Sequence, residues 1–494
     1  MKTSAVNQKD GYKADHRSQY PIGTELVYSN FTPRSTKYAS KVSGITDESI
    51  VFFGLQYFIK DHLLGSWKET FFSQPKDKVV ARYKRRMDAY LGIDKISTDH
   101  ISDLHDLGYL PISIRALPEG SSVEAKVPML TIENTLPDFF WLTNMLETII
   151  SCTLWKPCTS ATIAKSYRKV MEHYAKKTWT PLESIDFMGH DFSFRGMSGL
   201  QDAAMSGAGH LLSFKGTDTI PAIDFLEDYY LADCEKEVIA CSVPATEHSV
   251  MCMGGNDGEL NTFRRLIKEI YPSGPVSIVS DTWDFWAVVD DYLPTLKADI
   301  MSRGNSPLDK VVIRPDSGDP VKIICGDPGA NTESERKGAV ERLWEIFGGT
   351  ETKTGHKVID SHIGLIYGDS ITLERCNEIL HRLELKGFAP NNVVLGIGSY
   401  TYEYVTRDTY GFAMKATAGI VDGGLREIFK DPKTDDGMKK SAKGFLAVHR
   451  VGGVYQLIDQ VDRSTFESCE LQEVFRDGKL LVEQSLTEIR DRVK

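Results

Sequence analysis

The sequence predicts an α/β fold: an irregular, TIM-like α/β barrel beside a second α+β domain formed by the N- and C-terminal parts of the chain. Between residues 181 and 399, short apolar runs end in polar residues and lead into helical patterns, seven times in succession. Before this stretch, helical spacing and strand alternation are mixed, and after it apolar residues alternate as in hairpins. We therefore divide the chain into residues 1–180, 181–399 and 400–494.

The composition is that of an ordinary globular protein, with 494 residues, 41% hydrophobic and 26% charged. The net charge of −11 argues against a broad nucleic-acid surface, although a local basic pocket for phosphates is allowed. Eight cysteines without a CxxC pair predict reduced thiols and a cytoplasmic protein. The N-terminus lacks the apolar core of a secretory signal, and the most apolar window, Phe139 to Trp155, is interrupted by Asn144 and Glu147. We expect no contact with a membrane.

Residues 1–180 mix both kinds of element. The spacing predicts helices over residues 50–64, 79–91 and 141–174 and strands over residues 112–116 and 129–132. The second helix has a basic face, which we interpret as solvated, made of Lys78, Arg82, Lys84, Arg85 and Arg86. Residues 1–45 are polar, but their tyrosines indicate that they pack on another part of the chain.

Seven strand–loop–helix units follow, and they imply a parallel sheet. The predicted strands cover residues 185–187, 211–214, 239–243, 276–279, 311–313, 363–367 and 393–395. Their number and spacing favour a closed barrel over an open sheet. In a barrel the carboxyl ends of all strands lie on one face, where active sites form.

Polar residues that follow these strands are candidates for chemistry. They include Arg195, Asp218, Glu247, His248, Asp281, Arg314, Asp316 and Asp369. The adjacent Glu247 and His248 suit acid–base or phosphohistidine chemistry, although a histidine that caps the next helix is the alternative. A single aspartate after a strand is often only a helix N-cap. The shared face nevertheless favours a joint site.

The chemistry of this face indicates a phosphorylated ligand with Mg²⁺. Arginines suit phosphate oxygens, and Asp281 and Asp316 are hard oxygen ligands for Mg²⁺. The small loops at Gly368 and Gly398 let backbone N–H groups approach a phosphate. The sequence has no P-loop motif, no HExxH, and no third glycine after Gly396-Ile-Gly398 for a dinucleotide fingerprint.

The C-terminal part carries Arg407 and Lys415, followed by a lysine-rich loop from Lys430 to Lys443. Residues 445–481 alternate like hairpin strands around Gly452-Gly453 and Asp477-Gly478. We expect them to return to the N-terminal domain and complete its sheet.

Five segments in this order resemble the nicotinamide phosphoribosyltransferase family: His190–Gly196, Lys215–Thr219, Ser242–Ser249, Ile313–Gly318 and Phe429–Pro432. The resemblance spans about Asp10 to His449. It implies transfer of the phosphoribosyl group of 5-phosphoribosyl 1-pyrophosphate to nicotinamide, giving nicotinamide mononucleotide and pyrophosphate. It also implies Mg²⁺, ATP as phosphoryl donor to a histidine, and a head-to-tail homodimer with active sites at the subunit interface.

The resemblance assigns roles to individual residues. His248 resembles the histidine that ATP phosphorylates, and Glu247 would orient its imidazole. Phe192 would stack on one face of the pyridine ring and Tyr12 of the partner subunit on the other. Asp218 would accept an N–H from the amide of nicotinamide and repel the carboxylate of nicotinate. Arg195 would lie beside the ring.

The remaining assignments concern phosphates and the metal. Asp281, Arg314 and Asp316 resemble the ligands of the ribose, the pyrophosphate and Mg²⁺, and the positions expected to bind phosphate are Arg34, Arg407, Lys415 and Lys430. The chain departs from the family pattern at Gly398-Ser399-Tyr400, which replaces a longer glycine run, and at Ala413, where a serine is expected. These departures bear on the 5′-phosphate contacts. The lysines from Lys439 to Lys443 fit a solvated loop equally well.

Two alternatives remain open from the sequence. A nicotinate phosphoribosyltransferase is disfavoured by Asp218, and a non-catalytic ligand-binding protein on the same scaffold is disfavoured by the intact set of His248, Asp281, Arg314 and Asp316.

Overall fold

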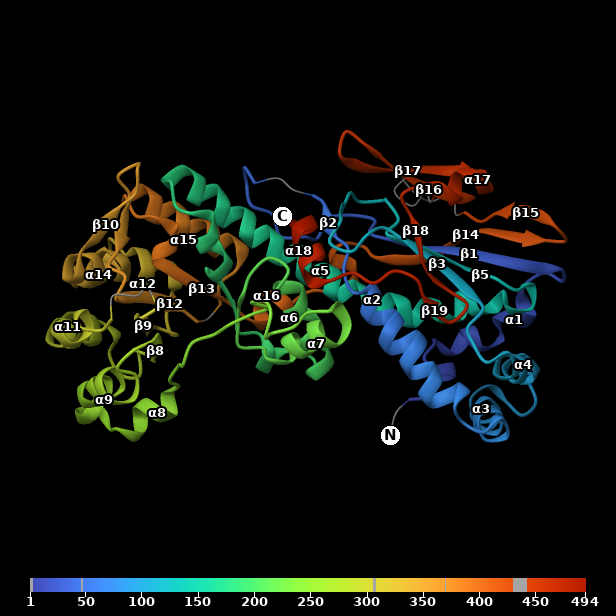
Figure 1. Cartoon of the computed structure of the whole chain (residues 1–494), viewed down its shortest axis with the longest axis horizontal. Helices are drawn as coiled ribbons and strands as arrows, with labels where there is room; N and C mark the ends of the chain where they lie inside the picture. Colours follow the sequence, from blue (N-terminus) through green and yellow to red (C-terminus); the bar gives the residue numbers. More distant parts are fainter. Residues whose placement is uncertain (1–2, 46–47, 305–307, 369, 430–441) are drawn as a thin grey trace.

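The computed structural model describes residues 3–45, 48–304, 308–368, 370–429 and 442–494. It has a mixed α/β fold with a parallel sheet at one end of the long axis and an antiparallel sheet at the other (Figure 1). The long helix α5 (Trp141–Thr178) contacts elements of both halves, including α6 and α15 on one side and β1 and β14 on the other.

The parallel sheet has the strand order β7-β6-β13-β12-β9-β8. Its strands are Gly216–Thr217 (β7), Gly189–Asp191 (β6), Val393–Ile397 (β13), Ile363–Tyr367 (β12), Val311–Arg314 (β9) and Val276–Val279 (β8). Single parallel bridges join the segment between β7 and β8 to both sheet edges, Gly216 with Cys241 and Ala245 with Ser277. The closed barrel stays a prediction, because single bridges rather than full ladders span this gap.

Three predicted strands are wrong in detail. Residues 185–187 belong to a 3₁₀ helix (Leu182–Phe187), and the strand lies at Gly189–Asp191 instead. Residues 211–214 follow α6 (Leu200–His210) as a turn, and residues 239–243 contribute only the bridge at Cys241. The reason is that an apolar side chain indicates burial and does not by itself indicate an extended strand. Phe214 is buried although it follows a turn, and its ring lies close to where a Cβ on Gly189 would be.

The other four strands are confirmed. Residues 276–279 and 363–367 match β8 and β12 residue for residue, and β9 and β13 extend the predictions by one and two residues. Most residues of these four strands are apolar and buried, as in parallel strands whose two faces are covered, although β8 is an edge strand and β9 ends in the half-buried Arg314.

The antiparallel sheet has the order β15-β14-β1-β5-β3-β18-β19. Its strands are Gly424–Glu427 (β15), Ala413–Val421 (β14), Thr24–Thr32 (β1), Leu130–Asn134 (β5), Ile112–Ala116 (β3), Gln472–Arg476 (β18) and Lys479–Leu480 (β19). Strand β1 pairs with β14 and β5, so the polar N-terminal segment supplies a central strand. The pairing of β18 with β3 confirms that the C-terminal part completes this sheet. The hairpin of β16 (Phe445–Val451) and β17 (Val454–Val461) turns at the predicted glycines.

The apolar stretch predicted as a helix over residues 50–64 begins as the short strand β2 (Ile50–Val51), which pairs with β4 (Ser122–Val123). Its helical part runs from α2 (Leu55–Tyr57) into a π-helix (Phe58–Ser66). The remaining helices are α1 (His16–Gln19), α3 (Lys76–Leu91), α4 (Asp99–Leu107), α7 (Pro221–Tyr230), α8 (His248–Met253), α9 (Glu259–Arg265), α10 (Phe285–Ala287), α11 (Leu293–Met301), α12 (Pro320–Cys325), α13 (Glu333–Lys337), α14 (Ala339–Phe347), α15 (Leu373–Leu385), α16 (Ser399–Tyr402), α17 (Arg463–Glu467) and α18 (Leu486–Val493). Among the described residues, none of the helices has the length and apolarity needed to cross a membrane.

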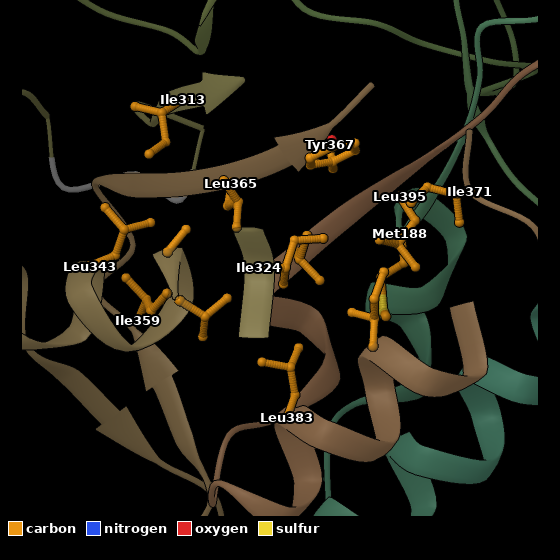
Figure 2. Close-up of a cluster of buried hydrophobic side chains, with 14 of the residues drawn as sticks. Met188, Ile313, Ile324, Leu343, Ile359, Leu365, Tyr367, Ile371, Leu383 and Leu395 are labelled. Atoms are coloured by element: carbon orange, nitrogen blue, oxygen red, sulfur yellow. The ribbon is translucent and has the colours of Figure 1, made fainter. Parts of the chain in front are cut away.

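The parallel sheet is held by a core between its strands and the helices that cover it. Figure 2 shows Leu365 and Leu395 of the sheet facing Ile324 of α12 and Leu383 of α15. These side chains are almost completely removed from solvent. This packing fixes the positions of the strand ends, which carry the polar loops.

Helix α15 offers a matched test of this core. Leu383 is 1% exposed and Leu385, two residues on, is 72% exposed. We expect Leu383→Ala to lower the free energy of unfolding by about 2–5 kcal/mol, because it leaves a cavity. Leu385→Ala should change it by less than about 0.5 kcal/mol. Urea titration followed by tryptophan fluorescence measures both, and equal effects would contradict the packing described here.

Candidate active site

Each of the six parallel strands ends at, or is followed within two residues by, a residue predicted to bind or react. They are Phe192 after β6, Asp218 after β7, Asp281 after β8, Arg314 at the end of β9, Gly368 after β12 and Gly398 after β13. We call this set the rim. The parallel register brings the strand ends to one edge, so the predicted gathering of these residues follows from the sheet.

Two neighbouring side chains hold the carboxylate of Asp218. Its Oδ1 lies 2.9 Å from Nε2 of His190 and accepts a 2.6 Å hydrogen bond from the hydroxyl of Ser242. Partial burial raises the pKa of Asp218, but these hydrogen bonds and the nearby charge of Arg314 outweigh it, so the pKa is below its ordinary value. The carboxylate therefore stays ionised and acts as an acceptor near neutral pH.

Phe192 lies beside this carboxylate. Its ring centroid is 4.4 Å from that of His190, the residue that contacts Asp218. The ring also packs against β13, where a Cβ on Gly396 would come within 2.8 Å of it. The backbone N–H of Phe192 donates to the carbonyl of Ile397 at 3.0 Å. A half-buried aromatic face thus stands next to an ionised acceptor.

Arg314 and Asp281 of the rim lie next to Asp316, which is carried by the loop after β9. One oxygen of Asp281, Oδ2, accepts from the backbone N–H groups of Asp316 and Ser317 at 2.8 and 2.7 Å. Arg314 donates through Nη2 to the carbonyl of Thr246 at 2.8 Å, and its Nε lies 4.0 Å from Oδ2 of Asp316. Asp281 therefore clamps the loop after β9, which carries Asp316.

Glycine at 368 lets the loop after β12 lie close to the loop after β9. A Cβ there would lie 2.2 Å from Oδ1 of Asp316 and 3.7 Å from Cδ of Arg314, so a larger residue would displace the Asp316 side chain.

The acidic residues fit a Mg²⁺ ion that is shared with a phosphate ligand. The second oxygen of Asp281, Oδ1, is buried and has no hydrogen-bond partner among the described residues. In the described part of the chain, no three histidine, cysteine, aspartate or glutamate side chains gather as a metal site. Mg²⁺ commonly takes only one or two carboxylates and completes its shell with water and substrate phosphates. Asp281 and Asp316 could hold it in this way.

His248 is the first residue of α8 and is exposed. Its Nδ1 lies 3.4 Å from the hydroxyl of Thr282, the residue after Asp281, so the imidazole stands next to the loop after β8. The Glu247 carboxylate accepts from the hydroxyl of Ser249, and its predicted role of orienting the imidazole stays a prediction. Glu247 is the N-cap residue of α8, and its extended backbone directs it to its own turn.

A second group of predicted residues lies on the antiparallel half. Tyr12, Arg34, Arg407 and Lys415 line one pocket of about 480 Å³, which we call the basic pocket. Arg34 is fixed by a 2.9 Å hydrogen bond from Nε to the carbonyl of Gly411. Tyr12 is 64% exposed, so its ring is available to a ligand or to another subunit.

The basic pocket and the rim are separate within one chain. The lining of the basic pocket includes none of the rim residues. Figure 1 shows α8, next to the rim, and α1, next to Tyr12, at opposite ends of the long axis. Tyr12 therefore lines a pocket whose described lining does not include Phe192.

Other predicted residues are placed as follows. Arg195 is exposed in a 3₁₀ turn (Phe194–Gly196) directly after Phe192. Ala413 lines the basic pocket. Lys443 forms an ion pair with Glu427 at 3.4 Å. The predictions for Asp369, Lys430, Lys439 and Lys440 lie outside the described residues.

Sequence reasoning assigned no role to three residues that hold the rim. His190 and Ser242 bind Asp218, and Thr246 accepts from Arg314. All three lie inside or next to the segments that resemble the family, so their position in the sequence could have indicated a role in the site. Their partners could not be known, because those partners lie 24 to 68 residues away in the chain.

The chain matches two family models. Residues 187–479 match the nicotinate phosphoribosyltransferase (NAPRTase) family, and residues 4–114 match the nicotinamide phosphoribosyltransferase N-terminal domain. Among solved structures, a nicotinate-nucleotide pyrophosphorylase from Pyrococcus furiosus has a TM-score of 0.55 at 15% identity, covering 99% of this chain and 94% of that one. Human nicotinic acid phosphoribosyltransferase also gives 0.55, at 14% identity and with 98% and 92% coverage. These structures share the fold.

Relatives in sequence are much closer. A nicotinamide phosphoribosyltransferase from Acinetobacter baylyi is 56% identical over all of this chain and 97% of its own length. Proteins of the same name from Mycoplasma pneumoniae and Xanthomonas campestris are 34% and 32% identical, covering 86% and 97% of this chain and 92% and 96% of their own lengths. The chain therefore belongs to the nicotinamide phosphoribosyltransferase family and is a phosphoribosyltransferase enzyme.

Proposed function

We propose that this enzyme transfers the 5-phosphoribosyl group from 5-phosphoribosyl 1-pyrophosphate to nicotinamide, releasing nicotinamide mononucleotide and pyrophosphate in NAD salvage. The observation that carries this proposal is the ionised, doubly hydrogen-bonded Asp218 beside the ring of Phe192. Three relatives bearing the name nicotinamide phosphoribosyltransferase support it.

Substrate choice follows from charge. The amide of nicotinamide donates an N–H to the Asp218 carboxylate, while Phe192 packs on the flat ring. Nicotinate would place its own carboxylate against Asp218. Like charges brought together in a partly desolvated site cost several kcal/mol, which is enough for selection by more than about tenfold.

Bond formation needs the ring nitrogen of nicotinamide to attack C1 of the ribose as the bond to pyrophosphate breaks. Arg314 neutralises charge that develops on the leaving pyrophosphate, and the loop clamped by Asp281 holds Asp316 toward it. A Mg²⁺ ion held by Asp281 and Asp316 would add charge neutralisation on the pyrophosphate. The backbone of Gly368 and Gly398 gives close access to phosphate groups.

His248 acts in this proposal as the acceptor of a phosphoryl group from ATP. Its exposure and its place beside the loop of Asp281 suit that role, because phosphohistidine adds negative charge next to the pyrophosphate site. Water then hydrolyses the phosphohistidine. The transfer itself does not require proton transfer to this imidazole.

The active enzyme is a homodimer in this proposal. The separation of the basic pocket from the rim supports it, since Tyr12, Arg34, Arg407 and Lys415 of one subunit can complete the rim of the other in a head-to-tail pair. A cytoplasmic location is supported by eight free cysteine thiols.

The most general test is product formation. Incubation with nicotinamide, 5-phosphoribosyl 1-pyrophosphate and Mg²⁺ should give nicotinamide mononucleotide, detected by chromatography. Absence of this product would favour a non-catalytic ligand-binding protein on the same scaffold.

Asp218→Ser should relax selectivity. Loss of the repelling carboxylate should lower the ratio of kcat/KM for nicotinamide over nicotinate by at least about tenfold. Asp224→Ser, in the exposed first turn of α7, removes the same charge away from the rim and is the control. An unaltered ratio in Asp218→Ser would show that selection lies elsewhere.

His248→Ala should abolish ATP hydrolysis and the stimulation of synthesis by ATP, while basal transfer continues. The exposed His381 provides the control substitution, His381→Ala, which should leave both activities intact. Release of phosphate from ATP is measured alongside nicotinamide mononucleotide. Unchanged ATP hydrolysis in His248→Ala would refute the phosphohistidine role.

Complementation tests the dimer. Arg314→Ala disables the rim and Arg407→Ala disables the basic pocket, so each homodimer should be nearly inactive. In a mixed dimer, one active site carries both substitutions and the other carries neither. If the two variant subunits pair at random, co-expression should therefore restore about a quarter of the wild-type activity. No recovery after co-expression would contradict a site shared between subunits.

A further inference from the structure

The structure has a second pocket rich in cations, which no part of the proposed reaction uses. It measures about 440 Å³ and lies between the N-terminal segment and helix α3 (Lys76–Leu91), and we call it the α3 pocket. Its lining includes Lys9, Arg82 and Arg86 and no acidic residue. The two arginines belong to the basic face that the sequence led us to interpret as solvated.

Lys9 is the informative member of this set. It is partly buried, and its Nζ donates to the phenol oxygen of Tyr83 at 3.1 Å and lies 3.6 Å from Sδ of Met145. Neither Lys9, Arg82 nor Arg86 forms an ion pair with a described carboxylate. Burial lowers the pKa of Lys9 to about 8. A cation withdrawn from water without a counter-charge is costly, and an anion in the α3 pocket would remove that cost.

The rest of the pocket wall is not suited to a bare inorganic ion. Met87 and the ring of Tyr90 offer apolar surface, and the buried side-chain oxygen of Asn7 has no hydrogen-bond partner in the described part of the chain. That oxygen can accept from an N–H or O–H group such as a base or a sugar carries. The volume lies within the range of roughly 300–1,000 Å³ that is usual for small-molecule sites.

We propose that the α3 pocket binds a nucleoside phosphate, with its phosphates on Lys9, Arg82 and Arg86 and its nucleoside against Tyr90 and Asn7. This site is distinct from the basic pocket. Along the chain, Lys9 and Gly11 line the α3 pocket, whereas Asp10 and Tyr12 line the basic pocket. The two pockets therefore lie on the two sides of one short segment of the chain.

The segment is tightly fitted between them. A Cβ on Gly11 would come within 2.2 Å of the hydroxyl of Tyr90, so the phenol lies directly against the backbone there. On the opposite side, Asp10 binds Thr148, and the buried Lys13 binds Glu147 of α5 at 2.7 Å. A ligand that holds Lys9 and Tyr90 therefore holds the turn that carries Tyr12. That consequence rests on the proposed function of Tyr12, but binding itself does not.

Acylation of Lys9 tests the site directly. The wild-type protein is treated with N-hydroxysuccinimidyl acetate at pH 8, and modification of the Lys9 peptide is measured by mass spectrometry. ADP should slow modification at least about fivefold, whereas adenosine, which has no phosphate, should not. The double variant Arg82→Glu, Arg86→Glu should lose this protection. The charge-matched control Lys78→Glu, Arg85→Glu, on the same helix but outside the pocket lining, should keep it.

The outcomes separate the alternatives. No protection of Lys9 by ADP would overturn the proposal, as would protection that survives the double variant. Equal protection by inorganic pyrophosphate would overturn the nucleoside part and leave a simple anion site. The milder pair Arg82→Gln, Arg86→Gln repeats the test if charge reversal prevents folding, which thermal unfolding checks. Phosphoribosyl transfer is assayed on the same samples, so that a failure of the proposed function can be distinguished from a failure of ligand binding in the α3 pocket.

Discussion

The parallel register of one sheet is the constraint on which the candidate site depends. Six strands run in the same direction, so their carboxyl ends and the loops that follow them meet at one edge. Each strand end or loop contributes one group to the rim: an aromatic ring, a carboxylate, a guanidinium or a glycine. Buried side chains such as Leu365, Leu395 and Leu383 hold the strands and helices together below this edge. The rim is therefore positioned by packing, and its polar contacts only adjust orientation.

Those contacts divide the rim into two working parts. Around Asp218, His190 and Ser242 fix an ionised acceptor beside an aromatic face, which is the chemistry of recognising a flat amide. Around Asp281, one oxygen orders the loop of Asp316, and the other is buried without a hydrogen-bond partner among the described residues. Arg314 connects the parts, because its charge also lowers the pKa of Asp218.

The sequence was informative where a pattern has a single physical cause. Apolar strands buried on both faces, such as β8 and β12, and glycine turns at residues 452–453 were predictable, as was the order of polar loops after strands. The strand at Gly189–Asp191 was missed because its first residue is glycine, chosen for contact with Phe214 and not for strand propensity. Partners such as Ser249 for Glu247 depend on backbone direction at a helix start, which residue order does not reveal.

The central claim is that Asp218 makes this fold select an amide over an acid. The most direct measurement is steady-state kinetics of the unmodified enzyme with nicotinamide and with nicotinate, each with and without ATP. The account predicts that kcat/KM is at least about tenfold higher for nicotinamide, and that ATP changes the rate without reversing that order. A higher kcat/KM for nicotinate would contradict it.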